Sequence, residues 1–212
     1  MIPKIIHYCW FGRGEKPELA KKCIASWKKF CPGFEIREWN EDNCDYLAMP
    51  FMAEAYAAKK YAFVSDVMRL VVLEQYGGVY FDTDVEVLRD ISPLLDDEGF
   101  IGFENDQFVN SGQVMAVVPH QPVVQAMIEE YRKMHFTNAD GSLNAVGCPH
   151  LNTDVMERFG LVRNGQEQSF RLDYPFDRLG GYYPSRKKGS VQIYTKVTML
   201  YDMYGELVNF LV

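Results

Sequence analysis

Two aspartates separated by one residue are the clearest candidates for chemistry in this chain. Asp82 and Asp84 follow the apolar run 79–81, whose β-forming residues predict a short buried strand, and Gly77 and Gly78 before it predict a tight turn. On an extended chain, residues two apart point to the same side, so the two acids repel unless positive charge lies beside them. A divalent cation such as Mg²⁺ takes one or two carboxylates and leaves room for water and substrate phosphates. Aspartates that only cap a turn have the same spacing, so the pattern alone is weak evidence.

A second group of polar residues lies on the helix expected just before this turn. Residues 61–76 contain neither glycine nor proline, and Ser65, Asp66 and Arg69 fall within one helical turn. Two interpretations remain open. Asp66 and Arg69 form an exposed ion pair worth about 0.3–0.5 kcal/mol, or both reach the aspartates of the next strand, which must pack nearby.

The beginning of the chain predicts one border of a ligand crevice. Residues 2–12 read as a strand that ends in a glycine loop, and such a loop often borders the crevice of an α/β domain. Trp10 at this edge is either a flat surface for a nucleobase or a core residue. His7 is expected to be a buried, hydrogen-bonded histidine and not a metal ligand.

The remaining pattern completes an α/β fold class. A polar, turn-rich stretch is expected over 104–112, the signal is weak over 137–189, and residues 182–188 are aromatic and basic. The tail 191–212 predicts a strand followed by a helix or strand. The other expected elements are helices over 17–30, 52–59 and 122–135 and strands over 34–39, 100–103 and 113–118.

Composition limits the classes of protein. The 212 residues fit a single domain, and 48% hydrophobic with 24% charged residues is ordinary for a folded protein. A net charge of −7 argues against a nucleic-acid binder. Five cysteines without a C-x-x-C pair favour reduced thiols in a cytoplasm. No apolar run approaches about 18 residues, so no membrane-spanning helix is expected.

Three motifs in this order resemble the sugar transferases that carry a DXD motif. They are Ile2–His7 with Trp10-Phe11-Gly12, then Ala62–Arg69, then Tyr76–Asp84. The family includes fungal initiating mannosyltransferases and bacterial capsular polysaccharide enzymes, and glucosylating toxins are distant relatives. The resemblance implies a GT-A fold with a mixed central sheet flanked by helices. It also implies a UDP- or GDP-hexose donor and Mn²⁺ or Mg²⁺.

The same resemblance assigns roles by position. Asp84 ligates the metal, and Asp82 touches the ribose or a metal-bound water as part of the metal site. Asp66 and Arg69 hold the donor sugar and its phosphate side. The other residues assigned to donor binding are Trp10, which stacks on the base, Ser65, and Asn110 near the sugar.

The function expected is a metal-dependent hexosyltransferase in polysaccharide biosynthesis, with retention at the anomeric carbon. Residues 1–212 form one catalytic domain, in which 1–118 bind donor and metal and 119–212 serve the acceptor side. The acceptor is a glycan or a lipid-linked oligosaccharide, and neither nucleic acid nor a transmembrane segment is involved. The location is cytoplasmic, compatible with peripheral association at the inner face of the membrane.

One departure from the family leaves an alternative open. Many relatives carry a histidine and a tryptophan near the C-terminus, but here the last histidine is His150 and the last tryptophan is Trp39. The lid over the donor is built differently or the chain is shortened. The alternative is therefore a degenerate, non-catalytic domain that binds nucleotide-sugar or glycan. A phosphohydrolase with Asp82 as nucleophile is less favoured, because such enzymes usually place their acids after the first strand.

Overall fold

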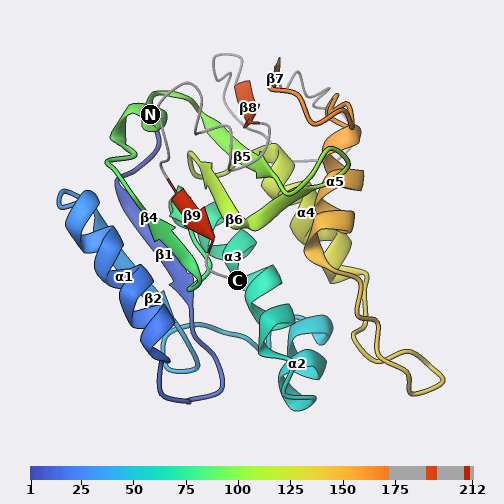
Figure 1. The fold of residues 1–212 in the computed structure, drawn as a ribbon. Helices are drawn as coiled ribbons and strands as arrows, with labels where there is room; N and C mark the ends of the chain where they lie inside the picture. The colour runs from blue at the N-terminus through green and yellow to red at the C-terminus, as the bar shows by residue number, and fades with distance from the viewer. Residues whose placement is uncertain (172–189, 195–207, 211–212) are drawn as a thin grey trace.

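The computed structural model describes residues 1–171, 190–194 and 208–210, which form a mixed β-sheet with helices on both faces (Figure 1). The predicted α/β class is confirmed. The strand order is β2-β1-β3-β6-β5-β8-β7. Their bounds are β1 Ile5–Cys9, β2 Glu35–Trp39, β3 Gly78–Tyr80, β5 Gly99–Phe103, β6 Val109–Val117, β7 Gln168–Arg171 and β8 Ser190–Tyr194. A separate pair joins β4 (Val85–Val87) to β9 (Val208–Phe210) in antiparallel fashion.

Strand direction determines where the loops gather. β1 runs parallel to both β2 and β3, whereas β6 is antiparallel to β3 and β5. The sheet continues with β8 parallel to β5 and β7 antiparallel to β8. Because β2, β1 and β3 are parallel, their C-terminal ends and the loops after them lie at one edge of the sheet.

Helices cover the two faces of the sheet and bury two apolar layers. Val79 and Phe81 pack in the layer that contains Trp27 of α1, whereas Tyr80 between them packs in the layer under the other helices. This alternation is the period of two that a strand buried on both faces shows. The helices are α1 Glu18–Phe30, α2 Pro50–Ala57, α3 Tyr61–Tyr76, α4 Pro122–Arg132 and α5 Cys148–Glu157, with a short 3₁₀ helix, η1, at Ser92–Asp96.

The turn between α3 and β3 is the one predicted from the glycine pair. Gly77 has φ 62° and Gly78 has φ 101°, both in the region that side chains with a Cβ rarely adopt. A Cβ on Gly78 would lie 2.7 Å from the Ile5 carbonyl oxygen, so the glycine also lets β1 approach. His7 fixes this turn: Trp39 Nε1 donates to its Nδ1 at 3.0 Å, which leaves Nε2 to donate to the Gly77 carbonyl at 2.8 Å. The expectation of a buried, hydrogen-bonded histidine is confirmed.

Several predicted boundaries were wrong. Strand β6 begins at Val109, inside the expected turn-rich stretch, because the Asn110 side chain accepts bonds from the Gly112 and Gln113 amides and so lets polar residues enter the sheet. The predicted helix over 122–135 ends at Arg132, where 3₁₀-type bonds close its last turn. Within the stretch of weak signal, the structure forms helix α5 from Cys148.

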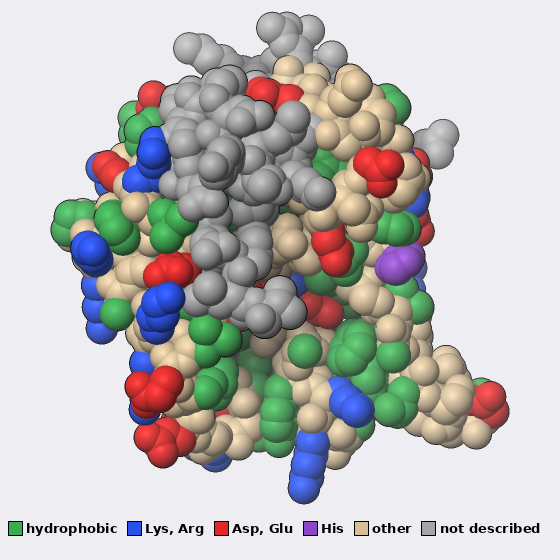
Figure 2. All heavy atoms as spheres, in the orientation of Figure 1, with side chains coloured by type: hydrophobic (Ala, Val, Ile, Leu, Met, Phe, Trp, Pro, Cys, Tyr) green, Lys and Arg blue, Asp and Glu red, His purple; other side chains and the backbone are tan. Residues whose placement is uncertain are grey.

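Two other stretches frame the described part of the chain. The loop between α4 and α5 projects from the body, as Figures 1 and 2 show, and a bridge between Thr137 and Leu143 closes it. In the predicted tail, β8 and β9 agree with the expected strands, whereas the stretches 182–188 and 195–207 lie outside the described residues.

His7 should make a pH-dependent contribution to stability. Burial is the main cause that lowers its pKa from 6.5 to about 4. The folded protein then binds fewer protons than the unfolded chain between these values, so this contribution is complete above pH 6.5 and is lost as the pH falls toward 4. Urea unfolding at a series of pH values should show that wild type loses up to about 3 kcal/mol more than His7→Gln between pH 7 and pH 4. Parallel curves for the two proteins would contradict a buried neutral imidazole.

Candidate active site

The candidate site lies where the parallel strands end. Trp10 follows β1 directly, Glu41 follows β2, and Asp82 follows β3. Glu41 links the loops after β1 and β2 to helix α2. Its carboxylate accepts bonds from the Gly12 amide at 2.6 Å and from the Tyr56 hydroxyl at 2.9 Å. The fold therefore brings the loops predicted to border a crevice to one edge.

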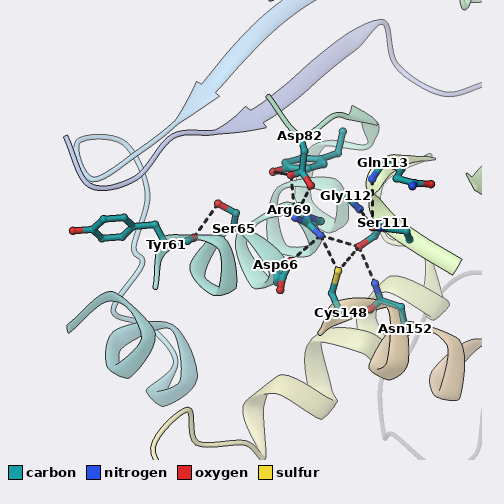
Figure 3. Close-up of polar contacts among 12 residues, drawn as sticks. Tyr61, Ser65, Asp66, Arg69, Asp82, Ser111, Gly112, Gln113, Cys148 and Asn152 are labelled. Carbon is teal, nitrogen blue, oxygen red and sulfur yellow. Dashed lines mark hydrogen bonds and ion pairs between the residues drawn. The ribbon is translucent and has the colours of Figure 1, made fainter. Parts of the chain in front are cut away.

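A buried guanidinium lies at the centre of the polar residues. The Arg69 side chain is 3% exposed, and its Nη2 lies 3.0 and 3.3 Å from the two carboxylate oxygens of Asp82. Its Nη1 lies 2.9 Å from Asp66 Oδ1, 3.3 Å from Ser111 Oγ and 3.1 Å from Cys148 Sγ (Figure 3). Of the two interpretations of Asp66 and Arg69, the structure therefore selects the buried one that reaches Asp82.

Asp82 is held from three sides but still reaches the surface. Its side chain is 38% exposed, and its Oδ1 also accepts a bond from the Tyr80 hydroxyl at 3.0 Å. Its amide donates to the Gly112 carbonyl at 2.9 Å. A Cβ on Gly112 would overlap the Asp82 carboxylate and lie 3.1 Å from Arg69 Nη1. Glycine at this position is what allows β6 to approach the ion pair.

Asp84 is placed quite differently from Asp82. The Val85 amide donates to the Asp82 carbonyl at 3.1 Å, so residues 82–85 form a turn, and the expectation of an extended chain with both acids on one side was wrong. The Asp84 side chain is exposed, and within the described part of the chain no hydrogen bond or ion pair engages it. The positive charge beside Asp82 comes from Arg69, and none of the described residues gives Asp84 such a partner.

The cluster retains excess negative charge. Burial raises the pKa of Asp82 to about 6; Arg69 opposes this shift, and Asp66 and Asp84 add to it. Burial also raises the pKa of Asp66, again against the effect of Arg69. One buried cation thus faces two carboxylates with a third nearby, so further positive charge would be stabilised here.

The donor set fits a hard divalent cation bound mainly by one residue. Carboxylate oxygens suit Mg²⁺ and Mn²⁺, which keep several waters and take one or two carboxylates from the protein. Asp84 has both oxygens available, whereas those of Asp82 are engaged by Arg69. Among the residues that the structure describes, no group of three acids, histidines or cysteines could enclose a metal.

Trp10 follows β1 at the edge of the site, and its position is compatible with both core packing and a surface for a base. The ring is half-buried and packs against the α1 layer. Its Nε1 donates to the Gly14 carbonyl at 2.7 Å, and Lys16 Nζ lies 5.7 Å from the ring centroid. Part of the ring is thus core, and part remains open to a ligand.

The side-chain bonds of Ser65 and Asn110 do not involve Arg69, Asp66 or Asp82. Ser65 Oγ donates to the Tyr61 carbonyl one turn back in α3, away from Arg69 (Figure 3). The Asn110 side-chain oxygen accepts a bond from the Gly112 amide at 2.8 Å. Asn110 therefore holds the backbone of β6 at Gly112, next to Asp82.

Five residues that contact the cluster were not predicted. Tyr80 could have been found, because it lies two residues before Asp82 and shares its side of the strand. Gly112, which lies in the predicted polar stretch, was a weaker indication of a close approach to the site. The others had no local signal, since Cys148 is 79 positions from Arg69 in the sequence. The full set is Tyr80, Ser111, Gly112, Cys148 and Asn152.

Comparison with known proteins shows what this chain is similar to. The family described as "Glycosyltransferase sugar-binding region containing DXD motif" matches residues 17–101. Inositol phosphoceramide mannosyltransferase 3 of Schizosaccharomyces pombe is 32% identical over 102 residues, 44% of this chain and 27% of that protein. Inositol phosphoceramide mannosyltransferase 1 of the same yeast is 28% identical over 63% of this chain and 44% of its own length. Human alpha-1,4-N-acetylglucosaminyltransferase is 31% identical over 50% and 28%, respectively. The chain thus spans less than half the length of these relatives.

The fold agrees with the sequence match. The solved PaToxG glycosyltransferase superposes with a TM-score of 0.56 at 18% identity, over 74% of this chain and 69% of that one. This likeness concerns the fold, and the expected GT-A architecture is confirmed by it. The resemblance is thereby confirmed: residues 17–101, which hold the second and third motifs, are similar to glycosyltransferases whose sugar-binding region contains the DXD motif, and the fold is similar to that of a solved glycosyltransferase.

Proposed function

We propose that this protein is a metal-dependent glycosyltransferase that moves a hexose from a nucleotide-diphosphate sugar to an acceptor. The observation that carries the proposal is the pairing of a buried Arg69–Asp82 contact with an exposed Asp84 carboxylate that no described residue engages, at the edge where the parallel strands end. Ligands bind outside the carboxyl ends of the strands in open α/β sheets, which is the corresponding edge. The family match over residues 17–101 supports the same class of reaction.

Each residue of the cluster contributes a different part. Asp84 would hold Mn²⁺ or Mg²⁺, which supplies neutralising charge to the departing diphosphate. Asp82 presents its exposed carboxylate edge to the ribose or to a metal-bound water. Asp66 can accept hydrogen bonds from hydroxyls of the sugar. Arg69 holds both carboxylates in place, because its Nη1 and Nη2 already face protein acceptors.

Other contacts complete the proposed donor site. Trp10 offers its open ring face to the base, a contact worth about 1–3 kcal/mol where aromatic side chains stack on bases. Ser65 and Asn110 would lie around the sugar. We propose that residues 1–118 bind donor and metal and 119–212 the acceptor, although Cys148 of the second part also contacts Arg69.

The acceptor proposed is a glycan or a lipid-linked oligosaccharide, with retention at the anomeric carbon. The fungal relatives are named for mannosyl transfer to an inositol phosphoceramide, which supports a hexose donor and a lipid-borne acceptor. Across the described segments, no helix is long and apolar enough to cross a membrane. All five cysteines are free, which supports a reducing compartment such as the cytoplasm, with peripheral contact to its membrane.

Asp84→Asn should abolish metal-dependent nucleotide binding without unfolding the protein. We expect calorimetry with UDP or GDP and Mn²⁺ to show affinity at least about tenfold lower, since one charge-neutralising ligand is lost. The melting temperature should stay within about 2 °C, because exposed side chains without partners contribute little to stability. Asp96→Asn removes an equally exposed charge from η1 and serves as the matched control. Equal nucleotide affinity with Mn²⁺ and with a chelator would contradict metal dependence.

An assay of donor hydrolysis and sugar transfer on the same proteins separates an enzyme from a degenerate binding domain. A protein that binds the nucleotide-sugar with Mn²⁺ but shows neither hydrolysis nor transfer over long incubation would be the non-catalytic alternative. Transfer or slow hydrolysis of the donor that disappears in Asp84→Asn supports the enzyme.

Arg69→Met should destabilise the protein strongly. Removing the buried cation leaves Asp66 and Asp82 without their partner, and breaking one side of a buried ion pair costs about 3–5 kcal/mol. Urea unfolding measures this loss directly. Arg69→Lys keeps the charge but cannot match the fork geometry, so an intermediate loss is expected. A loss below about 1 kcal/mol in Arg69→Met would show that the ion pair is not structurally coupled to the fold.

A further inference from the structure

We infer that Ser111, Asn152 and Cys148 are positioning residues that fix the plane of the Arg69 guanidinium, and through it the Asp82 carboxylate. The inference rests on the proposed function for its binding consequences, but its structural part can be measured in the free protein. It assigns to helix α5, far from the DXD motif in sequence, a part in shaping the donor site.

The contacts form a chain from α5 to the ion pair. Asn152 Nδ2 donates to Ser111 Oγ at 2.8 Å, and Arg69 Nη1 lies 3.3 Å from the same oxygen (Figure 3). Ser111 and Asn152 are fully buried. Because an arginine and an amide nitrogen can only donate, the serine oxygen must accept from both. Its hydroxyl proton can then point to Cys148 Sγ, which is 3.9 Å away.

These hydrogen bonds restrict rotation of the guanidinium, which the two carboxylates alone do not. Asp66 and Asp82 attract the guanidinium through different nitrogens, and charge attraction alone tolerates rotation of the group between them. Ser111 and Cys148 contact Nη1 from β6 and α5, on the side of the fold away from α3. A fixed guanidinium plane in turn sets which edge of Asp82 faces outward, because Nη2 engages both of its oxygens.

Stability alone does not account for Asn152. Its side-chain oxygen and Arg69 Nε are buried without a hydrogen-bond partner among the described residues. An unpaired buried polar atom lowers stability, so an apolar side chain would serve a purely structural role better. The amide is explained if its nitrogen is needed on Ser111.

The neighbouring Thr153 provides a matched control. It lies on the same helix and also joins α5 to β6, because its Oγ1 accepts a bond from the Val109 amide at 3.0 Å. Thr153 is as buried as Asn152, and among the described residues its hydroxyl bonds to Val109 and Pro149, not to Arg69. Thr153→Ala therefore removes a bond between the same two elements and leaves the guanidinium chain intact.

The first test is arginine side-chain NMR of the free protein, with the Arg69 signal assigned from Arg69→Lys. We expect slow rotation of the guanidinium in wild type. The rate should rise at least about threefold in Ser111→Ala and in Asn152→Ala, and stay unchanged in Thr153→Ala, since hydrogen bonds hold the group only in the intact chain. Rates that are equal in all four proteins, or that follow the melting temperature, overturn the inference.

The second test is a double-mutant cycle on the affinity for UDP or GDP with Mn²⁺, measured well below every melting temperature. Ser111→Ala and Asn152→Ala should each weaken binding about five- to tenfold, and the double variant no further, because Asn152 acts through Ser111. Cys148→Ala, which removes the sulfur beside Nη1, should weaken binding by a similar factor. Additive losses, or an equal loss in Thr153→Ala, contradict the inference. Absence of nucleotide binding in wild type would instead contradict the proposed function, and the NMR result would still decide the positioning role.

Discussion

The structure depends on a buried arginine that must find acceptors for its charge. Arg69 enters the protein from α3, and acceptors reach it from the end of β3, from β6 and from α5. A buried guanidinium must have its charge paired by nearby acceptors, so these elements must meet at one point. Gly112 is part of the same constraint, because any side chain there would occupy the place of the Asp82 carboxylate. The ion pair thus positions these elements relative to one another more than it adds net stability.

This arrangement divides the work of the two aspartates in the DXD motif. Asp82 is engaged by Arg69 and Tyr80, whereas the turn after it carries Asp84 into solvent. Among the described residues, protein donors therefore engage the Asp82 carboxylate but not that of Asp84. The excess negative charge around Asp82 gives the same edge of the sheet an attraction for positive charge. In the function proposed above, the metal ion that accompanies the nucleotide diphosphate would bring such a charge.

The sequence predicted the parts of the site that local rules control. The glycine pair, the short strand and the helix before it follow from backbone conformation and from periodicity, and the spacing of Asp66 and Arg69 follows from one helical turn. The extended-chain rule failed at the DXD motif because a hydrogen-bonded turn intervenes between the acids. Cys148 and Asn152 could not be found, because their contacts depend on how α5 docks on β6 and leave no pattern in the sequence. Fold and motif together favour a glycosyltransferase, but a function has to be inferred from the residues of the site and not from the fold alone.

The most direct test of this account is the anomalous diffraction of a crystal grown with Mn²⁺ and a nucleoside diphosphate. We expect a manganese peak against the Asp84 carboxylate, with the diphosphate on its other side and both Asp82 oxygens still engaged by Arg69. Nucleotide bound without manganese at Asp84, or manganese that draws Asp82 away from Arg69, would contradict the division of roles between the two aspartates.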